Sequence, residues 1–314
     1  MKILLAGFRD EQIRTLSGIF PEIDFISTDN IDIGSIQADG LIGLSRLAFD
    51  QVFTEKFLSE NNTIRWAHAP GAGIDKYLFP SLPSSNIVLT NGKIIQGPEV
   101  SEHAIALLLA LTRRIGFVTK GIPRERIPYP IELRFKTALV IGLGGIGLLV
   151  AERLSAFGMT VDAVTETNMP LVSSLRKIYY ADQLLEALSL ADVVIMAAPL
   201  TSRSRNMLSY DQLLAMKRDA YLINVSRGGN IDLNALMEML DAGKFSGVGL
   251  DVTNPEPLPQ DHSIHSIDRV IITPHLAGCS DQFHERNFEL IKANIRRFSA
   301  KLPLINIVDK LNGY

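Results

Sequence analysis

Short apolar runs alternate with amphipathic stretches in the N-terminal part of the chain. Segments such as Gln51–Glu60 have the polar and apolar spacing of a helix. This alternation predicts a parallel sheet with helices on its faces. The apolar runs predict strands at Ile3–Ala6, Ile23–Ile26, Gly40–Gly43, Arg65–Ala69 and Ile87–Thr90.

A second alternating series begins at Thr137. Before it, Pro98 opens a long apolar helix from Glu99 to Thr112, and residues 121–130, rich in proline and charge, predict a linker. The second series predicts six strands, near Leu139–Ile141, Thr160–Val164, Val193–Met196, Tyr221–Asn224, Val248–Leu250 and Val270–Thr273. Such a series is typical of a doubly wound sheet.

The chain continues beyond the strands of this second sheet with a last predicted helix, at about residues 281–299, and an apolar tail. We expect the chain to cross back and complete the first domain with them. The predicted domains are therefore residues 1–97 with 281–314, and residues 98–280, with a cleft between two lobes.

The composition excludes several classes of protein. The chain has 314 residues, 46% hydrophobic and 21% charged, which is enough for two cores. A net charge of -3, from 31 basic and 34 acidic side chains, suggests neither a nucleic-acid nor a membrane partner. No run reaches transmembrane length, Met1–Gly7 has the pattern of a strand rather than a signal peptide, and the lone Cys279 is expected to be a packed residue. We expect a cytoplasmic protein that binds small molecules.

A glycine-rich turn, Gly142-Leu-Gly-Gly-Ile-Gly147, joins the strand at Leu139–Ile141 to an apolar helical segment. In such a turn Gly142 permits the tight bend, Gly144 lets the backbone approach phosphates, and Gly147 lets the helix pack closely on the strand. The free N–H groups at the start of the helix attract an anion. The turn therefore predicts a dinucleotide site.

Three later segments place chemically active side chains just beyond predicted strands, where open α/β sheets bind ligands. Arg227 stands in Asn224-Val-Ser-Arg-Gly-Gly229, and its planar fork of donors suits a carboxylate. Glu256 lies between two prolines, which fix its direction, and His275 can exchange a proton near neutral pH. Each has an ordinary structural explanation when taken alone, but together they indicate a site.

The glycine turn, Arg227, Glu256 and His275, in this order at successive strand ends, resemble the D-isomer-specific 2-hydroxyacid dehydrogenase family. The matching segments are Gly142–Gly147, Val225-Ser-Arg-Gly-Gly229, Asp251-Val with Glu256-Pro257, Thr273-Pro-His275, Gly71-Ala-Gly-Ile-Asp75, Val100-Ser-Glu-His-Ala104, and Pro303–Asp309 with Gly313-Tyr314. The resemblance spans nearly the whole chain. It implies an α/β fold with two doubly wound parallel-sheet domains, a Rossmann-type nucleotide-binding domain and a flavodoxin-like substrate domain.

The resemblance also implies roles for these residues. Arg227 would clamp the carboxylate and carbonyl of a 2-oxo acid, His275 would protonate the carbonyl oxygen as hydride arrives, and Glu256 would hold the imidazole and favour its charged form. Main-chain N–H groups of Ala72 and Gly73 would complete the carboxylate pocket. The cofactor would contact Gly142, Gly144, Gly145, Ile146, Gly147, Thr165, Pro199, Asp251 and Gly278. Hydride transfer of this kind needs no metal, and we expect none.

Two segments depart from the family pattern. Thr165 stands where the family has a ribose-binding aspartate, and the next residue, Glu166, would repel the 2′-phosphate of NADP if it points inward. NAD and NADP therefore both stay open, with a slight lean to NAD. Residues 261–266 lack the Leu-Trp pair that many relatives carry, so the wall of the substrate pocket there is not defined.

The leading hypothesis is a reductase of 2-oxo acids such as glyoxylate, hydroxypyruvate or a larger aliphatic analogue. The alternatives are a nucleotide-sensing, corepressor-like binding protein on the same fold, a 3-phosphoglycerate dehydrogenase, and an enzyme of the formate dehydrogenase type. Intact Arg227, Glu256 and His275 argue against the nucleotide-sensing protein. We see no obvious basic cluster for a substrate phosphate and no appended regulatory domain after Tyr314, which argues against the 3-phosphoglycerate dehydrogenase. Glu256 in place of a glutamine argues against the formate dehydrogenase type.

The long helix after Pro98 bears on the oligomeric state. Its apolar surface would be costly to expose, and in the family it helps to form a two-fold dimer. We therefore expect a homodimer.

Overall fold

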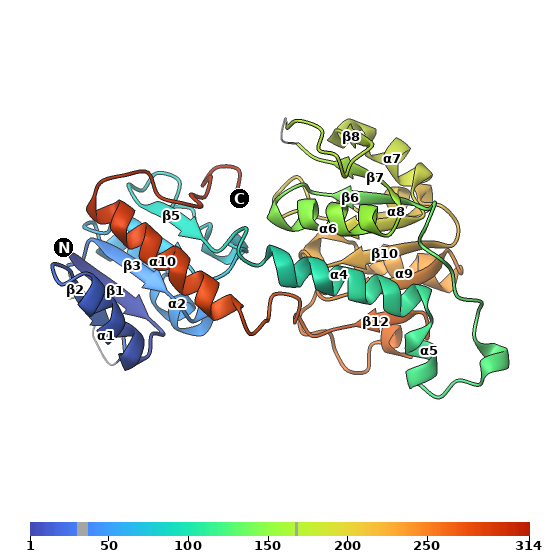
Figure 1. Ribbon diagram of the computed structural model, residues 1–314, viewed down its shortest axis with the longest axis horizontal. Coiled ribbons are helices and arrows are strands. Elements are labelled where there is room, and N and C mark those ends of the chain that lie inside the picture. Colours follow the sequence, from blue (N-terminus) through green and yellow to red (C-terminus); the bar gives the residue numbers. More distant parts are fainter. Residues whose placement is uncertain (30–36, 167–168) are drawn as a thin grey trace. The chain divides into compact units, whose positions relative to one another are not determined.

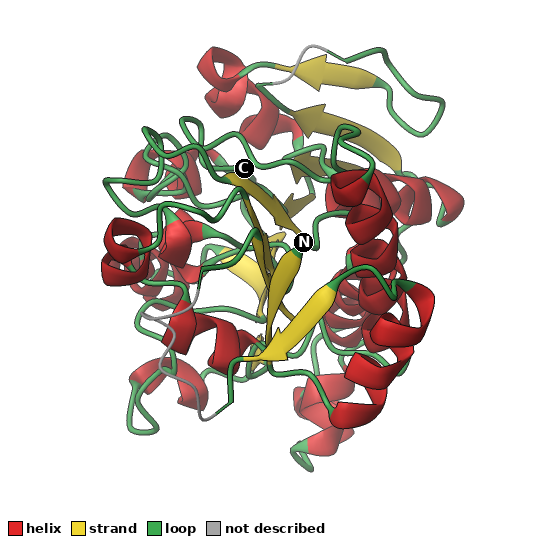
Figure 2. Ribbon diagram, turned by 90° about the vertical axis from the view of Figure 1, so that its left-hand side faces the viewer, coloured by secondary structure: helices red, strands yellow, loops and turns green. Residues whose placement is uncertain are grey.

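The computed structural model describes residues 1–29, 37–166 and 169–314 (Figure 1). The chain forms two compact units. The first unit comprises Met1–Gln96 and Ser280–Tyr314, and the second unit comprises Gly97–Cys279. Each unit contains a parallel sheet with helices on its faces (Figures 1 and 2), which confirms the predicted fold class.

The sheet of the first unit has the strand order β2-β1-β3-β4-β5. Its strands are β1 (Lys2–Ala6), β2 (Asp24–Ser27), β3 (Gly40–Gly43), β4 (Trp66–Ala69) and β5 (Val88–Asn91). All of them lie close to the ranges that the apolar runs predict. The C-terminal tail joins this sheet through an isolated antiparallel bridge between Thr90 and Ile307.

The helices of the first unit differ from the prediction in one place. They are α1 (Asp10–Ile19), α2 (Arg46–Val52), α3 (Glu55–Glu60) and α10 (Phe283–Ser299). The prediction of one helix over Gln51–Glu60 is wrong, because α2 ends at Val52 and α3 begins at Glu55. The Thr54 hydroxyl accepts a hydrogen bond from the Phe57 N–H and caps α3.

Two hydrophobic clusters hold the first unit together, one on each face of its sheet. Neighbouring residues of β1 show the division, since Leu4 packs into one cluster while Ile3 and Leu5 pack into the other. α2 and α3 contribute to the first cluster, and α1 and α10 contribute to the second. Figure 1 shows α10 lying along the sheet, so a C-terminal helix completes the unit that the N-terminal residues begin.

His68 in β4 gives the first unit a predicted sensitivity to acid. Its ring is fully buried, with Nδ1 2.9 Å from the Thr90 hydroxyl, and burial lowers the pKa of His68 from 6.5 to about 4. Between these two values the unfolded chain binds a proton that the folded chain excludes. The contribution of neutral His68 to the free energy of unfolding is therefore fully present above pH 6.5. It is lost as the pH falls towards 4, which lowers the free energy of unfolding by roughly 3 kcal/mol.

Urea unfolding across this pH range, for the wild type and for His68→Gln, measures the effect. The free energy of unfolding should fall less steeply with acid in the variant, which has no imidazole to titrate. Equal slopes in the two proteins would contradict the assignment.

The sheet of the second unit has the strand order β12-β11-β10-β9-β6-β7-β8. Its strands are β6 (Thr137–Ile141), β7 (Thr160–Val164), β8 (Lys177–Tyr179), β9 (Val193–Met196), β10 (Ala220–Asn224), β11 (Phe245–Leu250) and β12 (Val270–Ile272). The strands predicted from the sequence are present, and β8 is an addition. It lies at the edge of the sheet, where Lys177 is exposed and only Tyr179 is buried, so no apolar run marks it.

The helices of the second unit are α4 (Gly97–Thr112), α5 (Ile115–Thr119), α6 (Gly145–Ala156), α7 (Leu184–Leu190), α8 (Tyr210–Ala215) and α9 (Leu233–Asp241). α4 packs against α6 and against β10 and β11. The proline-rich segment at residues 121–130 leads from α5 towards β6 and contains one short turn of 3₁₀ helix, at Arg124–Arg126. Residues 121–130 lie within the second unit, so the prediction that they link two domains is wrong.

The chain reverses its path across the second sheet at β6. It adds β7 and β8 on one side of β6, and then places β9, β10, β11 and β12 on the other side. The carboxyl ends of β6 and β9 thus flank a switch point, where open α/β sheets bind their ligands. The glycine turn at Gly142–Gly147 lies at this point, directly after β6.

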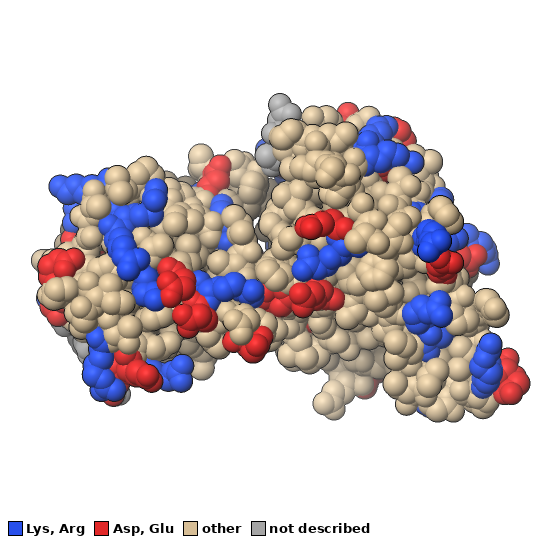
Figure 3. All heavy atoms as spheres, viewed as in Figure 1, with Lys and Arg blue, Asp and Glu red and all other residues tan. Residues whose placement is uncertain are grey.

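The charged surface is mixed in sign. On the face that Figure 3 shows, basic and acidic side chains are interspersed, as the net charge of -3 leads one to expect. Mixed charge of this kind does not attract a polyanion strongly. Within the described parts of the chain, no helix is both long and apolar enough to cross a lipid bilayer.

Candidate active site

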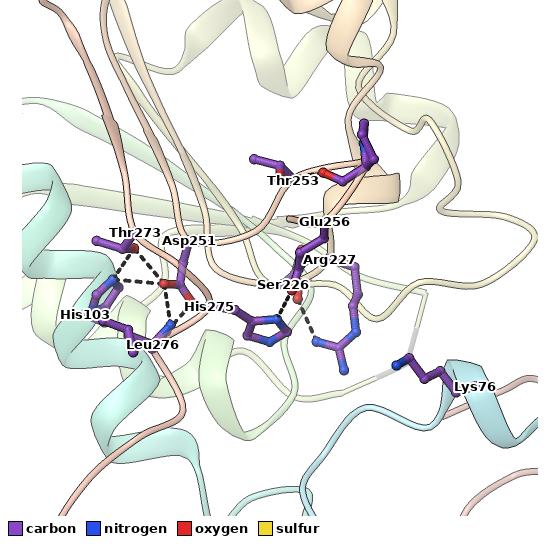
Figure 4. Close-up of polar contacts among 12 residues, drawn as sticks. Lys76, His103, Ser226, Arg227, Asp251, Thr253, Glu256, Thr273, His275 and Leu276 are labelled. Atoms are coloured by element: carbon purple, nitrogen blue, oxygen red, sulfur yellow. Dashed lines mark hydrogen bonds and ion pairs between the residues drawn. The ribbon is translucent and has the colours of Figure 1, made fainter. Parts of the chain in front are cut away.

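The three predicted catalytic side chains follow three neighbouring strands of the second unit. β10, β11 and β12 are parallel and adjacent, so their carboxyl ends lie at one edge of the sheet. Arg227 follows β10, Glu256 follows β11 and His275 follows β12. Figure 4 shows the three side chains in one region.

The imidazole of His275 is paired with Glu256. Its Nδ1 lies 2.5 Å from Oε1 of the carboxylate, and the two side chains are 35% and 41% exposed. This contact leaves Nε2 as the ring nitrogen that can exchange a proton with a ligand. His275 has a φ of 55°, a left-handed conformation that is uncommon outside glycine. The fold therefore holds this side chain at a cost in local strain.

A compact turn after β10 positions Arg227. Oδ1 of Asn224 accepts hydrogen bonds from the N–H and the hydroxyl of Ser226, and Nδ2 of Asn224 donates to the Arg227 carbonyl. Nη1 of Arg227 donates to the Ser226 carbonyl at 2.8 Å. In Figure 4 the guanidinium lies in the same region as the His275 ring. The turn can thus present a fork of N–H donors next to a proton donor.

Gly228 lets the loop after β11 pack directly against the turn after β10. A Cβ at this position would lie 1.9 Å from the carbonyl oxygen of Thr253 and 2.0 Å from its carbonyl carbon. Thr253 stands in the loop that carries Glu256. A close backbone approach that only glycine permits therefore sets the spacing between the loops that carry Arg227 and Glu256.

Gly228→Ala should displace the Thr253 backbone, lower the free energy of unfolding by about 1–3 kcal/mol and lower turnover through the shift of Glu256. The matched control is Gly229→Ala, whose Cβ would meet the side-chain end of Leu200 at 3.1 Å, a contact that can yield. Thermal unfolding and steady-state kinetics measure both effects. If the two alanine variants behaved alike, the close approach would not matter.

Asp251 is buried and organises the loop that carries His275. Its Oδ1 accepts hydrogen bonds from the Thr273 hydroxyl at 2.6 Å and the Leu276 N–H at 2.9 Å, and its own carbonyl accepts from the His275 N–H. The ring of His103, on α4, lies 2.8 Å from the Thr273 hydroxyl and 3.3 Å from the Asp251 carboxylate. The structure thus shows a positioning role for Asp251, while its contact with a cofactor stays a prediction.

The glycine turn has the geometry of an anion cradle. α6 begins at Gly145, and among the described residues no side chain caps its N-terminus. A Cβ at Gly144 would meet no heavy atom within 4 Å, whereas a Cβ at Gly147 would lie 1.9 Å from the Gly142 carbonyl oxygen. One side of the turn is therefore open, and the other side is packed helix against strand. These residues fit the pyrophosphate of a dinucleotide.

The other residues predicted to contact the cofactor lie along the same edge of the sheet. They are Ile146 in the first turn of α6, Thr165 after β7, Pro199 after β9, Asp251 after β11 and Gly278 in the loop after β12. Thr165 is only 7% exposed. Among the described residues, no group of three His, Cys, Asp or Glu side chains is placed to hold a metal ion.

The two residues predicted to bind substrate through their main chain, Ala72 and Gly73, lie in the first unit, in the loop after β4. The Ala72 N–H donates to the side chain of Gln96 at 2.9 Å, and the Ala72 carbonyl accepts from the side chain of Asn91 at 2.7 Å. The loop is therefore held in place by two amide side chains. Its role in substrate binding stays a prediction.

Four residues lie in or beside the segments that resemble the family, but the sequence analysis gives them no positioning role: Asn224, Gly228, Thr273 and His103. Asn224 carries a local signal, because asparagine at the end of a strand favours a turn closed by its own side chain. Gly228 and His103 carry none that a single sequence reveals, because their partners are distant along the chain. Their roles depend on which strands become neighbours.

A comparison with known families identifies the chain. The family profile described as D-isomer specific 2-hydroxyacid dehydrogenase, NAD binding domain, matches residues 105–277, more than half of the chain. The protein belongs to the D-isomer specific 2-hydroxyacid dehydrogenase family. This finding confirms the resemblance drawn from the motifs and makes the protein an NAD(P)-dependent oxidoreductase.

Known proteins are similar to this dehydrogenase over most of its chain. A glyoxylate reductase of Thermofilum pendens is 32% identical over 234 residues, which cover 71% of this chain and 68% of that protein. A D-3-phosphoglycerate dehydrogenase of Methanocaldococcus jannaschii is 31% identical over 246 residues, 77% of this chain and 47% of that protein. The structure of D-lactate dehydrogenase from Aquifex aeolicus, solved with NAD and lactic acid, is 26% identical with a TM-score of 0.76, and the match covers 95% of this chain and 96% of that chain.

Proposed function

We propose that this dehydrogenase reduces small 2-oxo acids, such as glyoxylate and hydroxypyruvate, to the 2-hydroxy acids. The observation that carries the proposal is the His275–Glu256 contact of 2.5 Å at the same sheet edge as Arg227. Reduction of a 2-oxo acid requires a proton donor beside a carboxylate clamp, and this edge offers both. The glyoxylate reductase among the relatives supports the substrate class.

The residues would divide the work as follows. The reduced nicotinamide, when bound, supplies the hydride that the carbonyl carbon accepts. Arg227 binds the substrate carboxylate through its N–H donors and orients the carbonyl group. Protonated His275 donates the proton on Nε2 to the carbonyl oxygen, which becomes the hydroxyl of the product, and Glu256 accepts the hydrogen bond from Nδ1–H. In the reverse direction the neutral ring takes the hydroxyl proton.

Turnover with a panel of 2-oxo acids tests the proposal. The purified protein is mixed with NADH or NADPH and with glyoxylate, hydroxypyruvate, pyruvate or phosphohydroxypyruvate, and oxidation of the nucleotide is followed spectrophotometrically. We expect turnover with small unphosphorylated acids. Turnover confined to phosphohydroxypyruvate would favour the 3-phosphoglycerate dehydrogenase alternative instead.

A nucleotide-sensing, corepressor-like protein on the same fold is the alternative from a different class. Such a protein would bind the cofactor and show no hydride transfer to any acid of the panel. The contact between Glu256 and His275 argues against it, because sensing alone does not require a proton donor held by a carboxylate.

We propose that the protein is a homodimer. Most apolar residues of α4 are buried within the second unit itself, so α4 is not the exposed surface expected from the sequence. The neighbouring helix α5 carries Ile115 and Val118, which are 50% and 62% exposed, and burial against a second copy would remove them from water. Sedimentation should show a dimer, and a monomer at all concentrations would reject the proposal. A cytoplasmic location also stays a prediction.

A further inference from the structure

The hydroxyl of Thr273, directly after β12, lies between two titratable side chains (Figure 4). It is 2.6 Å from Oδ1 of Asp251 and 2.8 Å from Nε2 of His103, and this ring nitrogen also lies 3.3 Å from the same carboxylate oxygen. The Asp251 side chain is 1% exposed and the His103 side chain is 22% exposed. The His103–Thr273–Asp251 group is therefore largely shielded from water.

The protons available to this group set the direction of its hydrogen bonds. A threonine hydroxyl has one proton and a carboxylate only accepts, so the Thr273 hydroxyl donates to Asp251. The oxygen of the same hydroxyl then accepts a hydrogen bond from the His103 ring. The bonding pattern thus assigns a proton to Nε2 of His103, in the neutral ring as well as in the charged ring.

Asp251 holds the backbone at and beyond His275. Its Oδ1 accepts from the Leu276 N–H and its Oδ2 from the Ala277 N–H, both at 2.9 Å, and its carbonyl accepts from the His275 N–H at 2.9 Å. The φ of 55° at His275 is a conformation that persists only where the surrounding structure enforces it. A rotation of the Asp251 carboxylate would release Leu276 and Ala277 together.

His103 adds a helix to this arrangement. It lies in α4, which packs against β10 and β11, whereas Asp251 and Thr273 lie in loops at the carboxyl ends of β11 and β12. Because Nε2 already presents a proton to the Thr273 oxygen, the hydroxyl proton stays directed towards Asp251. The helix thereby fixes the carboxylate on which the loop of His275 depends.

We propose that His103 is a positioning residue of the reduction. Its Nε2–H acts through Thr273 and Asp251 to keep His275 in the backbone conformation that presents the imidazole for proton transfer. The inference rests on the proposed function, in which His275 donates the proton. In this role His103 does not touch the substrate, so its loss should affect turnover more than substrate binding by Arg227.

His103→Leu should lower kcat about tenfold and change KM less than twofold, because the ring donor is lost while the turn that carries Arg227 is unaltered. His103→Gln keeps an N–H donor near the position of Nε2 and should recover most of kcat. The matched control is Thr112→Val, which removes a buried hydroxyl of α4 that donates to the Leu108 carbonyl at 2.9 Å. This control should retain wild-type kcat.

Thr273→Val tests the same hydrogen bond from its other partner. This variant should also lower kcat, and His103→Leu should have little further effect when it is added, because both changes interrupt one path to Asp251. Losses of kcat that multiply in the double variant would overturn the proposal.

Hydrogen exchange at residue resolution measures the positioning without turnover. The Leu276 and Ala277 N–H groups should exchange about tenfold faster in folded His103→Leu and close to wild-type rates in His103→Gln. The Thr273 N–H, which donates to the Leu250 carbonyl within the sheet, is the internal reference and should not change.

Faster exchange together with a lower kcat, both restored by glutamine, supports the proposal. Unchanged exchange or unchanged kcat in His103→Leu, or a glutamine variant no better than the leucine variant, overturns it. A wild type that turns over no 2-oxo acid would instead reject the proposed function, and the exchange rates would still decide whether His103 holds the loop of His275.

Discussion

His275→Ala is expected to lower kcat for reduction of 2-oxo acids by about 10²- to 10⁴-fold, because the carbonyl oxygen would lose its proton donor. Nδ1 of the ring lies 2.5 Å from Oε1 of Glu256, and the backbone of His275 has a left-handed φ of 55°. Alanine has no group that can donate a proton in place of the ring. The Kd for NADH should change little, because the glycine turn that we expect to bind the pyrophosphate is not altered. Steady-state kinetics and calorimetry on the same preparation measure the two quantities.

The control is His265→Ala, which removes another histidine of the second unit; this side chain is exposed, and its ring Nε2 lies 3.1 Å from the Pro259 carbonyl oxygen. The His265→Ala enzyme should retain wild-type kcat. A folded His275→Ala enzyme with wild-type turnover would remove His275 from the reaction and with it the proposed mechanism.

Arg227→Ala should lower kcat/KM by about 10³-fold, and the loss should appear in both parameters. The guanidinium would hold the substrate carboxylate in the ground state and orient and polarise the carbonyl in the transition state, so its removal affects KM and kcat together. The expected effect combines lost orientation with lost electrostatic stabilisation.

Arg227→Lys distinguishes the charge from the fork. Lysine keeps the positive charge but cannot present two parallel N–H donors to one carboxylate. Compared with Arg227→Ala, the Arg227→Lys enzyme should therefore have a lower KM, closer to that of the wild type, and a kcat that is hardly improved. Kinetics of Arg227→Ala equal to those of the wild type would exclude the clamp.

Most of the fold follows from the apolar runs, and the exceptions have physical reasons. Central strands of a parallel sheet are buried on both faces and so are continuously apolar, which makes β6 and β9 visible in the sequence. β8 lies at the edge and contains Lys177, so its polar residues hide it. The break between α2 and α3 depends on the Thr54 hydroxyl, a single hydrogen bond inside a periodic segment.

The sequence predicts the three candidate catalytic side chains of this sheet edge, but it does not predict the contacts that hold them in place. Arg227, Glu256 and His275 each follow an apolar run, and parallel strands bring their carboxyl ends to one edge. The approach of Gly228 to Thr253, the bonds of Asp251 and the contact of His103 with Thr273 all join segments whose proximity depends on strand order. Strand order follows from the packing of the whole unit, so sequence spacing does not reveal these contacts.

The central claim is that a proton from His275 and a hydride from the cofactor are added to a 2-oxo acid that Arg227 holds. The most direct measurement is the stoichiometry and chirality of the product formed from hydroxypyruvate or pyruvate with NADH. The account predicts one D-2-hydroxy acid for each cofactor oxidised by the wild type, and neither product nor oxidation at a comparable rate with His275→Ala. A wild-type protein that binds the nucleotide yet oxidises none with any 2-oxo acid would contradict it.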